Sequence, residues 1–194
     1  MTQPTSNSHF SKQHLILLLA SILTGGIAGL SGYILGQYFY MLFVFPFILL
    51  TIGLAFFLPT LKFFKTSSAL YNALCGLLMG LAIFTAFHYT EYSIFNARIT
   101  ARIESSQGVD KATASKSLDS FLKEKTGLGG FAGFMKYQQS QWRPYVYYFV
   151  KDGNITGSQD LALRGGIAWL YLAGEATMLA GGLALTGFFA SKKI

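Results

Sequence analysis

Residues 13–61 of the chain read QHLILLLASILTGGIAGLSGYILGQYFYMLFVFPFILLTIGLAFFLPTL, and these 49 positions contain no Asp, Glu, Lys or Arg. A helix needs roughly 20 apolar residues to cross the hydrocarbon core of a bilayer, so this stretch is long enough for two crossings. A second uncharged stretch covers residues 66–90, and a third covers residues 165–191 with Glu175 as its only charged residue. The charge pattern therefore predicts four membrane-spanning helices.

The composition is also typical of a membrane protein. The 194 residues are 52% hydrophobic and only 12% charged, whereas an ordinary soluble domain has about 25% charged residues. Residues 92–165 hold 16 of the 23 charged residues, and no other long segment has a water-facing composition. We expect a single membrane domain over residues 1–194, in which residues 92–165 form an extramembrane loop with interfacial helices.

Several function classes are excluded or disfavoured by the residue content. Cys75 is the only cysteine, so the chain has no disulfide framework and no cysteine-based metal site. The net charge of +7 suits anionic lipid headgroups, and no basic patch with interleaved aromatic residues suggests nucleic acid. No phosphate-binding loop, zinc-protease helix or nucleophile elbow is present. We expect no cofactor, no metal site and no nucleic-acid partner.

The expected fold is an all-α bundle of four spans, at about residues 14–37, 40–58, 69–89 and 166–190. Only residues 37–39 separate the first two spans, which predicts a tight antiparallel hairpin. Pro46 is expected to kink the second span, because proline removes a backbone donor and clashes with the preceding turn. Pro59 is expected to end it.

Small residues recur at intervals of four on the predicted spans. Helices associate in lipid through close backbone approach, which glycine permits. We therefore expect helix packing at Gly25, Gly29, Gly32, Gly36, Gly76, Gly80, Gly174 and Gly181. The alternative, in which these glycines are tolerated without a packing role, stays open.

The loop between the third and fourth spans has an order of its own. Phe95, Ile99 and Ile103 recur every four residues, which predicts that the third span continues as an amphipathic helix. Asp110 can cap a second helix over residues 111–125. Farther along, residues 128–135 form a short apolar stretch suited to a membrane interface. Residues 145–150 are β-prone, and Asp152-Gly153 is a turn signal that favours a small hairpin.

Four spans place both termini on the same side of the membrane. Cytoplasmic loops carry an excess of Lys and Arg, and the side of the termini carries Lys12, Lys62, Lys65, Lys192 and Lys193. Three arginines near the ends of the spans argue for the opposite orientation. We expect a multi-pass protein of the plasma membrane or bacterial inner membrane with cytoplasmic termini.

Glu175 is the first candidate functional residue. A carboxylate deep in a span costs several kcal/mol unless it pairs, takes a proton or faces the bundle interior. Hydroxyl partners at similar depth are Thr24, Ser31, Thr51 and Thr85. One interpretation is a proton or cation site, and the other is a carboxyl that holds helices together.

His88 and Glu91 are the second candidate, because a spacing of three places both on one face of a helix. An imidazole beside a carboxylate can relay a proton or bind a metal, although two ligands are too few for a metal site. The pair is expected near the headgroup level, where a solvated surface is the simpler interpretation. Glu175 is expected several residues deeper, so the three side chains need not meet.

The sequence leaves three functions open. The first is a non-enzymatic subunit or assembly protein of a larger membrane complex, which associates with other membrane subunits or with itself through glycine-rich faces. The second is a homo-oligomeric proton or cation channel or transporter that uses Glu175. The third is an enzyme acting on lipid with His88 and Glu91 at the interface.

Overall fold

A computed structural model describes residues 12–64, 68–141, 147–151, 154–157 and 165–191. Its helices are α1 (Lys12–Gly36), α2 (Phe45–Phe64), α3 (Ala69–Gln107), α4 (Lys111–Thr126), α5 (Gly130–Gln141) and α6 (Gly166–Ala190). Its strands are β1 (Phe39–Met41), β2 (Tyr147–Lys151) and β3 (Asn154–Gly157). The predicted spans 69–89 and 166–190 therefore lie within α3 and α6.

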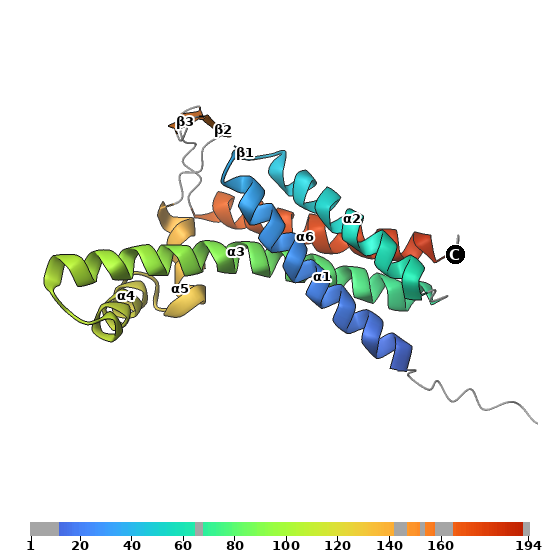
Figure 1. The fold of residues 1–194 in the computed structure, drawn as a ribbon, viewed down its shortest axis with the longest axis horizontal. Helices are drawn as coiled ribbons and strands as arrows, with labels where there is room; N and C mark the ends of the chain where they lie inside the picture. Colours follow the sequence, from blue (N-terminus) through green and yellow to red (C-terminus); the bar gives the residue numbers. More distant parts are fainter. Residues whose placement is uncertain (1–11, 65–67, 142–146, 152–153, 158–164, 192–194) are drawn as a thin grey trace, which may run out of the picture.

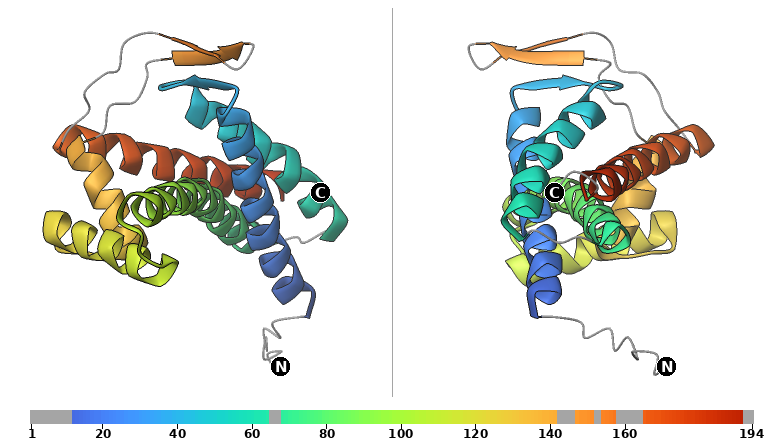
Figure 2. Two further views of the ribbon diagram at one scale, coloured as in Figure 1. Left: turned by 60° about the vertical axis from the view of Figure 1, so that its left-hand side comes forward. Right: turned by 90° about the vertical axis from the view of Figure 1, so that its right-hand side faces the viewer.

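Four of the described helices, α1, α2, α3 and α6, are long and apolar enough to cross a membrane. α3 is the longest, with 39 residues, and it projects well beyond the other three (Figure 1). α6 runs alongside the first half of α3, while α1 crosses α3 and α2 lies over α1 and α6 (Figures 1 and 2). α4 and α5 pack on the projecting half of α3.

The core consists of two large clusters and a small third one, formed by Leu42 and Ala168. The main cluster joins the four long helices through fully buried side chains that include Leu17, Leu49, Met79, Ile83 and Leu183. A second cluster lies between the projecting half of α3 and the helices α4 and α5. Its members include Phe95, Ile99, Ile103, Leu118, Leu122 and Phe134. The amphipathic extension of α3 therefore has a partner within the chain.

Local signals set the ends of α3 and α4. The side chain of Ser68 accepts a hydrogen bond from the Tyr71 backbone N–H at the start of α3, and Gly108 ends that helix in the left-handed conformation, with φ 65°. Asp110 caps α4 by accepting from the Thr113 N–H, as the sequence predicts. A side-chain oxygen at this position satisfies a backbone donor that the helix cannot pair internally.

The second span differs from its prediction at both ends. It begins at Phe45, so Pro46 lies in the first turn of α2, where a missing backbone N–H costs no helical hydrogen bond. The predicted kink at Pro46 is therefore wrong. The predicted end at Pro59 is also wrong, because α2 continues through Pro59 to Phe64.

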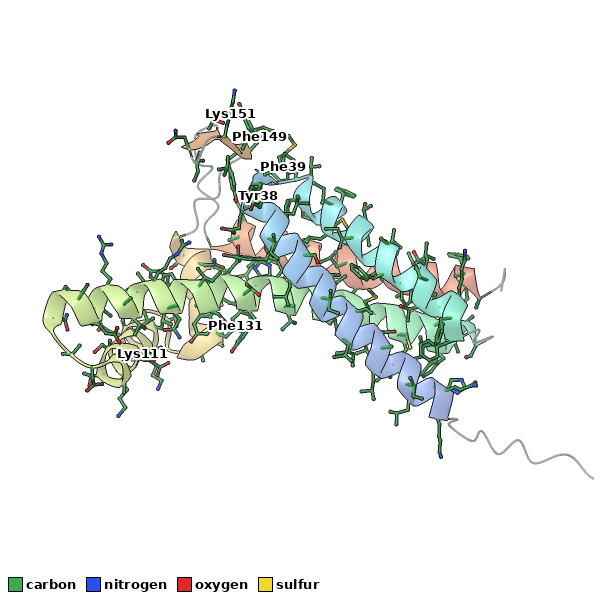
Figure 3. The ribbon with its side chains drawn as sticks, viewed as in Figure 1. Tyr38, Phe39, Lys111, Phe131, Phe149 and Lys151 are labelled. Carbon is green, nitrogen blue, oxygen red and sulfur yellow. The ribbon has the colours of Figure 1, made fainter. Side chains whose placement is uncertain are left out.

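The described chain is mostly helical, and a three-stranded antiparallel sheet with the order β1-β2-β3 adds to the expected helical bundle. β2 and β3 form the predicted hairpin, whose turn residues lie outside the described part of the chain. β1 begins at the end of the predicted connection, residues 37–39, and continues into residues 40 and 41, which were predicted to start the second span. Phe39 pairs with Phe149, and their ring centres lie 5.0 Å apart (Figure 3).

Candidate functional site

The candidate site is a buried contact between α3 and α6 that joins an imidazole to two carboxylates. His88 Nδ1 lies 2.9 Å from Oε2 of Glu91, one helical turn further along α3. His88 Nε2 lies 3.4 Å from Oε2 of Glu175 on α6. The side chains of His88 and Glu175 are each 5% exposed, whereas that of Glu91 is 32% exposed.

This contact corrects two expectations about depth. Glu175 was expected to lie deeper than His88, and His88 was expected on a solvated surface, yet the two side chains meet and both are buried. His88 on α3 is therefore a partner for Glu175 that the hydroxyls suggested from the sequence do not include.

Glycine contacts explain why the two residues meet. A Cβ added at Gly76 would collide with the backbone of Leu183, and one added at Gly80 would lie 2.5 Å from the Cα of Ala180. Residue numbers that increase along α3 therefore face residue numbers that decrease along α6, as expected for antiparallel helices. Eight residues further along α3 from Gly80, the same register places His88 opposite Leu172, about one turn from Glu175, and the two long side chains span that offset.

The same register explains why the expected depth of Glu175 relative to His88 is wrong. The predicted span boundaries place residue 166 at the same membrane level as residue 89, and so place Glu175 deeper than His88. The structure instead places the first turns of α6 beside the part of α3 that continues beyond residue 89. A usable signal was present, because Gly76, Gly80 and His88 are separated by multiples of four and share one face of α3.

The geometry favours a protonated imidazole. A neutral imidazole donates from only one ring nitrogen, whereas an imidazolium donates from both. Here each ring nitrogen of His88 faces a carboxylate oxygen. One imidazolium between two carboxylates leaves one negative charge, which a second bound proton would neutralise.

Aromatic rings surround the imidazole on its remaining sides. The ring centre of Phe84 lies 4.5 Å from that of His88, and Phe87 lies at 5.2 Å with its plane nearly perpendicular. Phe87 packs in turn against Tyr33 and Phe45 of the neighbouring helices. The contact between His88 and Glu175 therefore lies in an apolar surrounding, where an unpaired charge would be costly.

Glu91 connects the buried pair with a more polar region. It lines a cavity of about 430 Å³ between α1, α3 and α5, together with Tyr33, Gln37 and Arg98. Its partial exposure gives the cluster one end near solvent, while Glu175 forms the closed end.

Three of the hydroxyl partners suggested for Glu175 bond within their own helices instead. Thr24 donates to the Ala20 carbonyl, Ser31 to that of Ile27, and Thr51 to that of Phe47, at 2.7 to 2.9 Å. Thr85 lines a cavity on another side of α6. The structure thus brings together three of the predicted site residues, His88, Glu91 and Glu175, and no predicted hydroxyl bonds to Glu175 among the described residues.

The predicted packing glycines fall into two groups. In the first group a Cβ would contact a neighbouring helix, as at Gly25 and Gly29 against the Met79 and Ile83 carbonyls of α3. Gly32, Gly36, Gly76 and Gly80 belong to this group as well. In the second group, Gly174 and Gly181 on α6, a Cβ would meet nothing within 4 Å among the described residues.

Neither metal-ligand grouping nor similarity to known proteins assigns a role to this site. Within the described ranges, no group of three or more His, Cys, Asp or Glu side chains could hold a metal ion. Comparison with known proteins finds no match, either to a protein-family model, to a curated protein or to a solved structure.

Proposed function

We propose that the chain is a non-enzymatic integral membrane subunit or scaffold protein of a larger membrane complex. The observation that carries this proposal is the division of glycines on α6. Gly182 and Gly187 meet side chains or backbone of the same chain, whereas Gly174 and Gly181 meet nothing within 4 Å. A further helix from a partner, or from a second copy, would have the close approach that these two positions leave open.

The open positions form a continuous row. Gly174, Thr177 and Gly181 are separated by intervals of three and four, so they lie on one face of α6. That face points away from α3, because the buried residues of the helix, which include Glu175, Leu179 and Leu183, lie on the opposite side. A row of small residues on an outer face is typical of a helix that another transmembrane helix contacts.

The buried cluster is consistent with a structural role. His88 joins α3 to α6 beside the glycine contacts that hold the same two helices close. In this proposal the pair fixes the register of two helices, and Glu175 carries no substrate. Such a link supports a rigid scaffold on which a partner can dock.

Membrane residence with cytoplasmic termini is part of the proposal. Four helices of sufficient length and apolarity support it, and Lys12 begins α1 while Lys62 lies in the last turn of α2. The start of α1, the end of α2 and the end of α6 lie on one side of the structure (Figures 1 and 2). Lys65, Lys192 and Lys193 lie outside the described residues.

The test is association in mild detergent. We expect the wild-type chain to purify together with another membrane protein or as an oligomer, and Gly181→Leu to release it as a monomer. Gly26→Leu is the matched control, because Gly26 also meets nothing within 4 Å but lies among the exposed, bulky side chains of Ile22, Leu23 and Leu30. A wild-type monomer without any partner, or an equal effect of Gly26→Leu, would contradict the proposal.

A second candidate function is a proton or cation path through Glu175. One observation favours it, namely the chain of contacts from the cavity at Glu91 through His88 to Glu175. This candidate requires Glu175→Gln to abolish flux in liposomes while the chain still assembles. Unchanged flux in that variant would contradict the proton or cation path, and only the subunit proposal would remain.

A further inference from the structure

A second cavity, distinct from the one at Glu91, lies between α3, α5 and α6. Its volume is about 420 Å³, within the range of roughly 300 to 1,000 Å³ that small-molecule sites occupy. Apolar side chains form most of its wall, including Phe84 from α3, Phe131 from α5, and Leu172 and Ala176 from α6. Figure 3 shows Phe131 on the segment of α5 that passes beside α3.

Gln139 places an unsatisfied polar group in this apolar wall. The residue is only 4% exposed, and it lines the cavity. Its Nε2 has no hydrogen-bond partner among the described residues. Buried amide groups are nearly always hydrogen-bonded, because an unmade bond costs the full desolvation penalty. An acceptor on a bound molecule would satisfy this donor.

Lys136 adds a positive charge to the same cavity, one turn of α5 before Gln139. Its Nζ donates to the Thr126 carbonyl at 2.7 Å, and no carboxylate among the described side chains forms an ion pair with it. Because the carbonyl is neutral, the charge of the ammonium group remains available to an anion. An apolar cavity with one donor and one cation suits an amphiphile with an acidic head.

We propose that this cavity binds a single anionic glycerophospholipid. One acyl chain lies between Phe84, Leu172 and Ala176, an ester carbonyl accepts from Gln139 Nε2, and the phosphate faces Lys136. Trp169 lines the cavity and is 58% exposed, and an exposed tryptophan at the start of a span is typical of the membrane interface. A lipid can therefore enter sideways from the bilayer.

This site is independent of the association proposed above. Trp169, Leu172 and Ala176 face the cavity, whereas Gly174 and Gly181 lie on another face of α6. Loss of lipid binding and loss of partner association would thus follow from different substitutions.

The experiment measures thermal unfolding of the full chain in detergent micelles that contain either phosphatidylglycerol or phosphatidylcholine. A ligand that binds only the folded state raises the midpoint, and at a given concentration a tighter ligand raises it more, with the logarithm of its affinity. We expect phosphatidylglycerol to raise the midpoint more than phosphatidylcholine does. Gln139→Leu should weaken the apparent affinity about fivefold to tenfold, the effect of one hydrogen bond, without lowering the midpoint in lipid-free micelles.

Two further variants assign the charge. Lys136→Gln should abolish the difference between the two lipids, and Lys116→Gln, which removes an exposed charge on α4, should preserve it. Glycerol phosphate, which has the head without acyl chains, should cause no shift. The proposal is overturned if Gln139→Leu and Lys136→Gln keep the full response to phosphatidylglycerol, or if glycerol phosphate reproduces it.

Discussion

His88 and Glu175 are 87 positions apart in the chain, yet their side chains meet with Nε2 3.4 Å from Oε2 in the interior between α3 and α6. The contact unites the only two buried side chains among the His, Asp, Glu, Lys and Arg residues of the described part of the chain. It joins the same two helices that close glycine contacts hold together. The free energies of unfolding of the single and double variants distinguish a coupled structural pair from two independent side chains.

Removing either partner should destabilise the fold strongly. His88→Leu leaves Glu175 buried without its imidazole, and an uncompensated buried charge costs about 3 to 5 kcal/mol. Glu175→Leu should cost less, because Glu91 remains beside His88. The double variant should be more stable than the sum predicts, with a coupling of about 1 to 3 kcal/mol. Unfolding by sodium dodecyl sulfate, followed by circular dichroism, gives all four free energies.

Glu124→Gln is the control for that cycle, since Glu124 is 74% exposed and its contact with Lys125 lies at the surface. It should change the free energy of unfolding by less than about 0.5 kcal/mol. Additive effects of His88→Leu and Glu175→Leu would mean that the two side chains are not coupled.

The glycines of α3 and the open glycines of α6 should respond in opposite directions to the same substitution. Gly80→Ala puts a methyl group 2.5 Å from Ala180, and forcing two packed helices apart costs about 1 to 3 kcal/mol. Gly181→Ala meets nothing within 4 Å, so the gain in helix propensity should stabilise the isolated chain by about 0.5 kcal/mol. The midpoint of thermal unfolding in detergent measures both, and a loss at Gly181 equal to that at Gly80 would refute the contrast.

The sequence predicted features that depend on residues close together in the chain, and it missed features that depend on residues far apart in the chain. Helix caps and four-residue periods act within one or two turns, so Asp110 and the row of Phe95, Ile99 and Ile103 predicted the ends of α4 and the extension of α3. The Asp152-Gly153 turn signal likewise acts locally and predicted the hairpin of β2 and β3.

Pairings over long range could not be predicted in the same way. Phe39 and Phe149 form a strand pair across more than half of the chain, and apolar residues 39–41 look like the start of a span when read alone. The height of Glu175 relative to His88 depends on where α6 begins beside α3. That offset is set by close contacts such as Gly80 against Ala180, which no single segment encodes.

The contact between α4 and α5 should weaken in acid. The Lys123 ammonium group, 2.8 Å away, and the Gly130 backbone N–H, at 2.7 Å, hold the pKa of Asp119 below its ordinary value of 3.8. A carboxylate with a lowered pKa stabilises the folded state fully above its unfolded pKa and loses that contribution as the pH falls through the lowered value. Hydrogen exchange in the first turn of α5 should therefore quicken, relative to neighbouring segments, below about pH 4.

Asp119→Asn tests this assignment, because the amide can still face Gly130 but carries no charge. The variant should show the faster exchange already at neutral pH and lose most of the acid-dependent change. Glu124→Gln, on the same helix, should leave the acid response as in the wild type. An unchanged response in Asp119→Asn would place its origin in another group.

The sheet should depend on one tyrosine that ties it to α1. The hydroxyl of Tyr148 on β2 donates to the carbonyl of Gly36, the last residue of α1, and the ring of Tyr148 stacks on Tyr40 of β1 with centres 5.8 Å apart. Tyr148→Phe keeps the ring and removes the hydroxyl, so it should weaken the attachment by about 1 kcal/mol.

Tyr147→Phe is the matched control, since Tyr147 is the neighbouring residue and is 41% exposed. Hydrogen exchange at Val150, whose N–H donates to the Tyr38 carbonyl at 2.8 Å, should quicken about fivefold in Tyr148→Phe, the rate equivalent of that energy, and stay unchanged in Tyr147→Phe. Equal protection in both variants would mean that strand pairing alone holds the sheet in place.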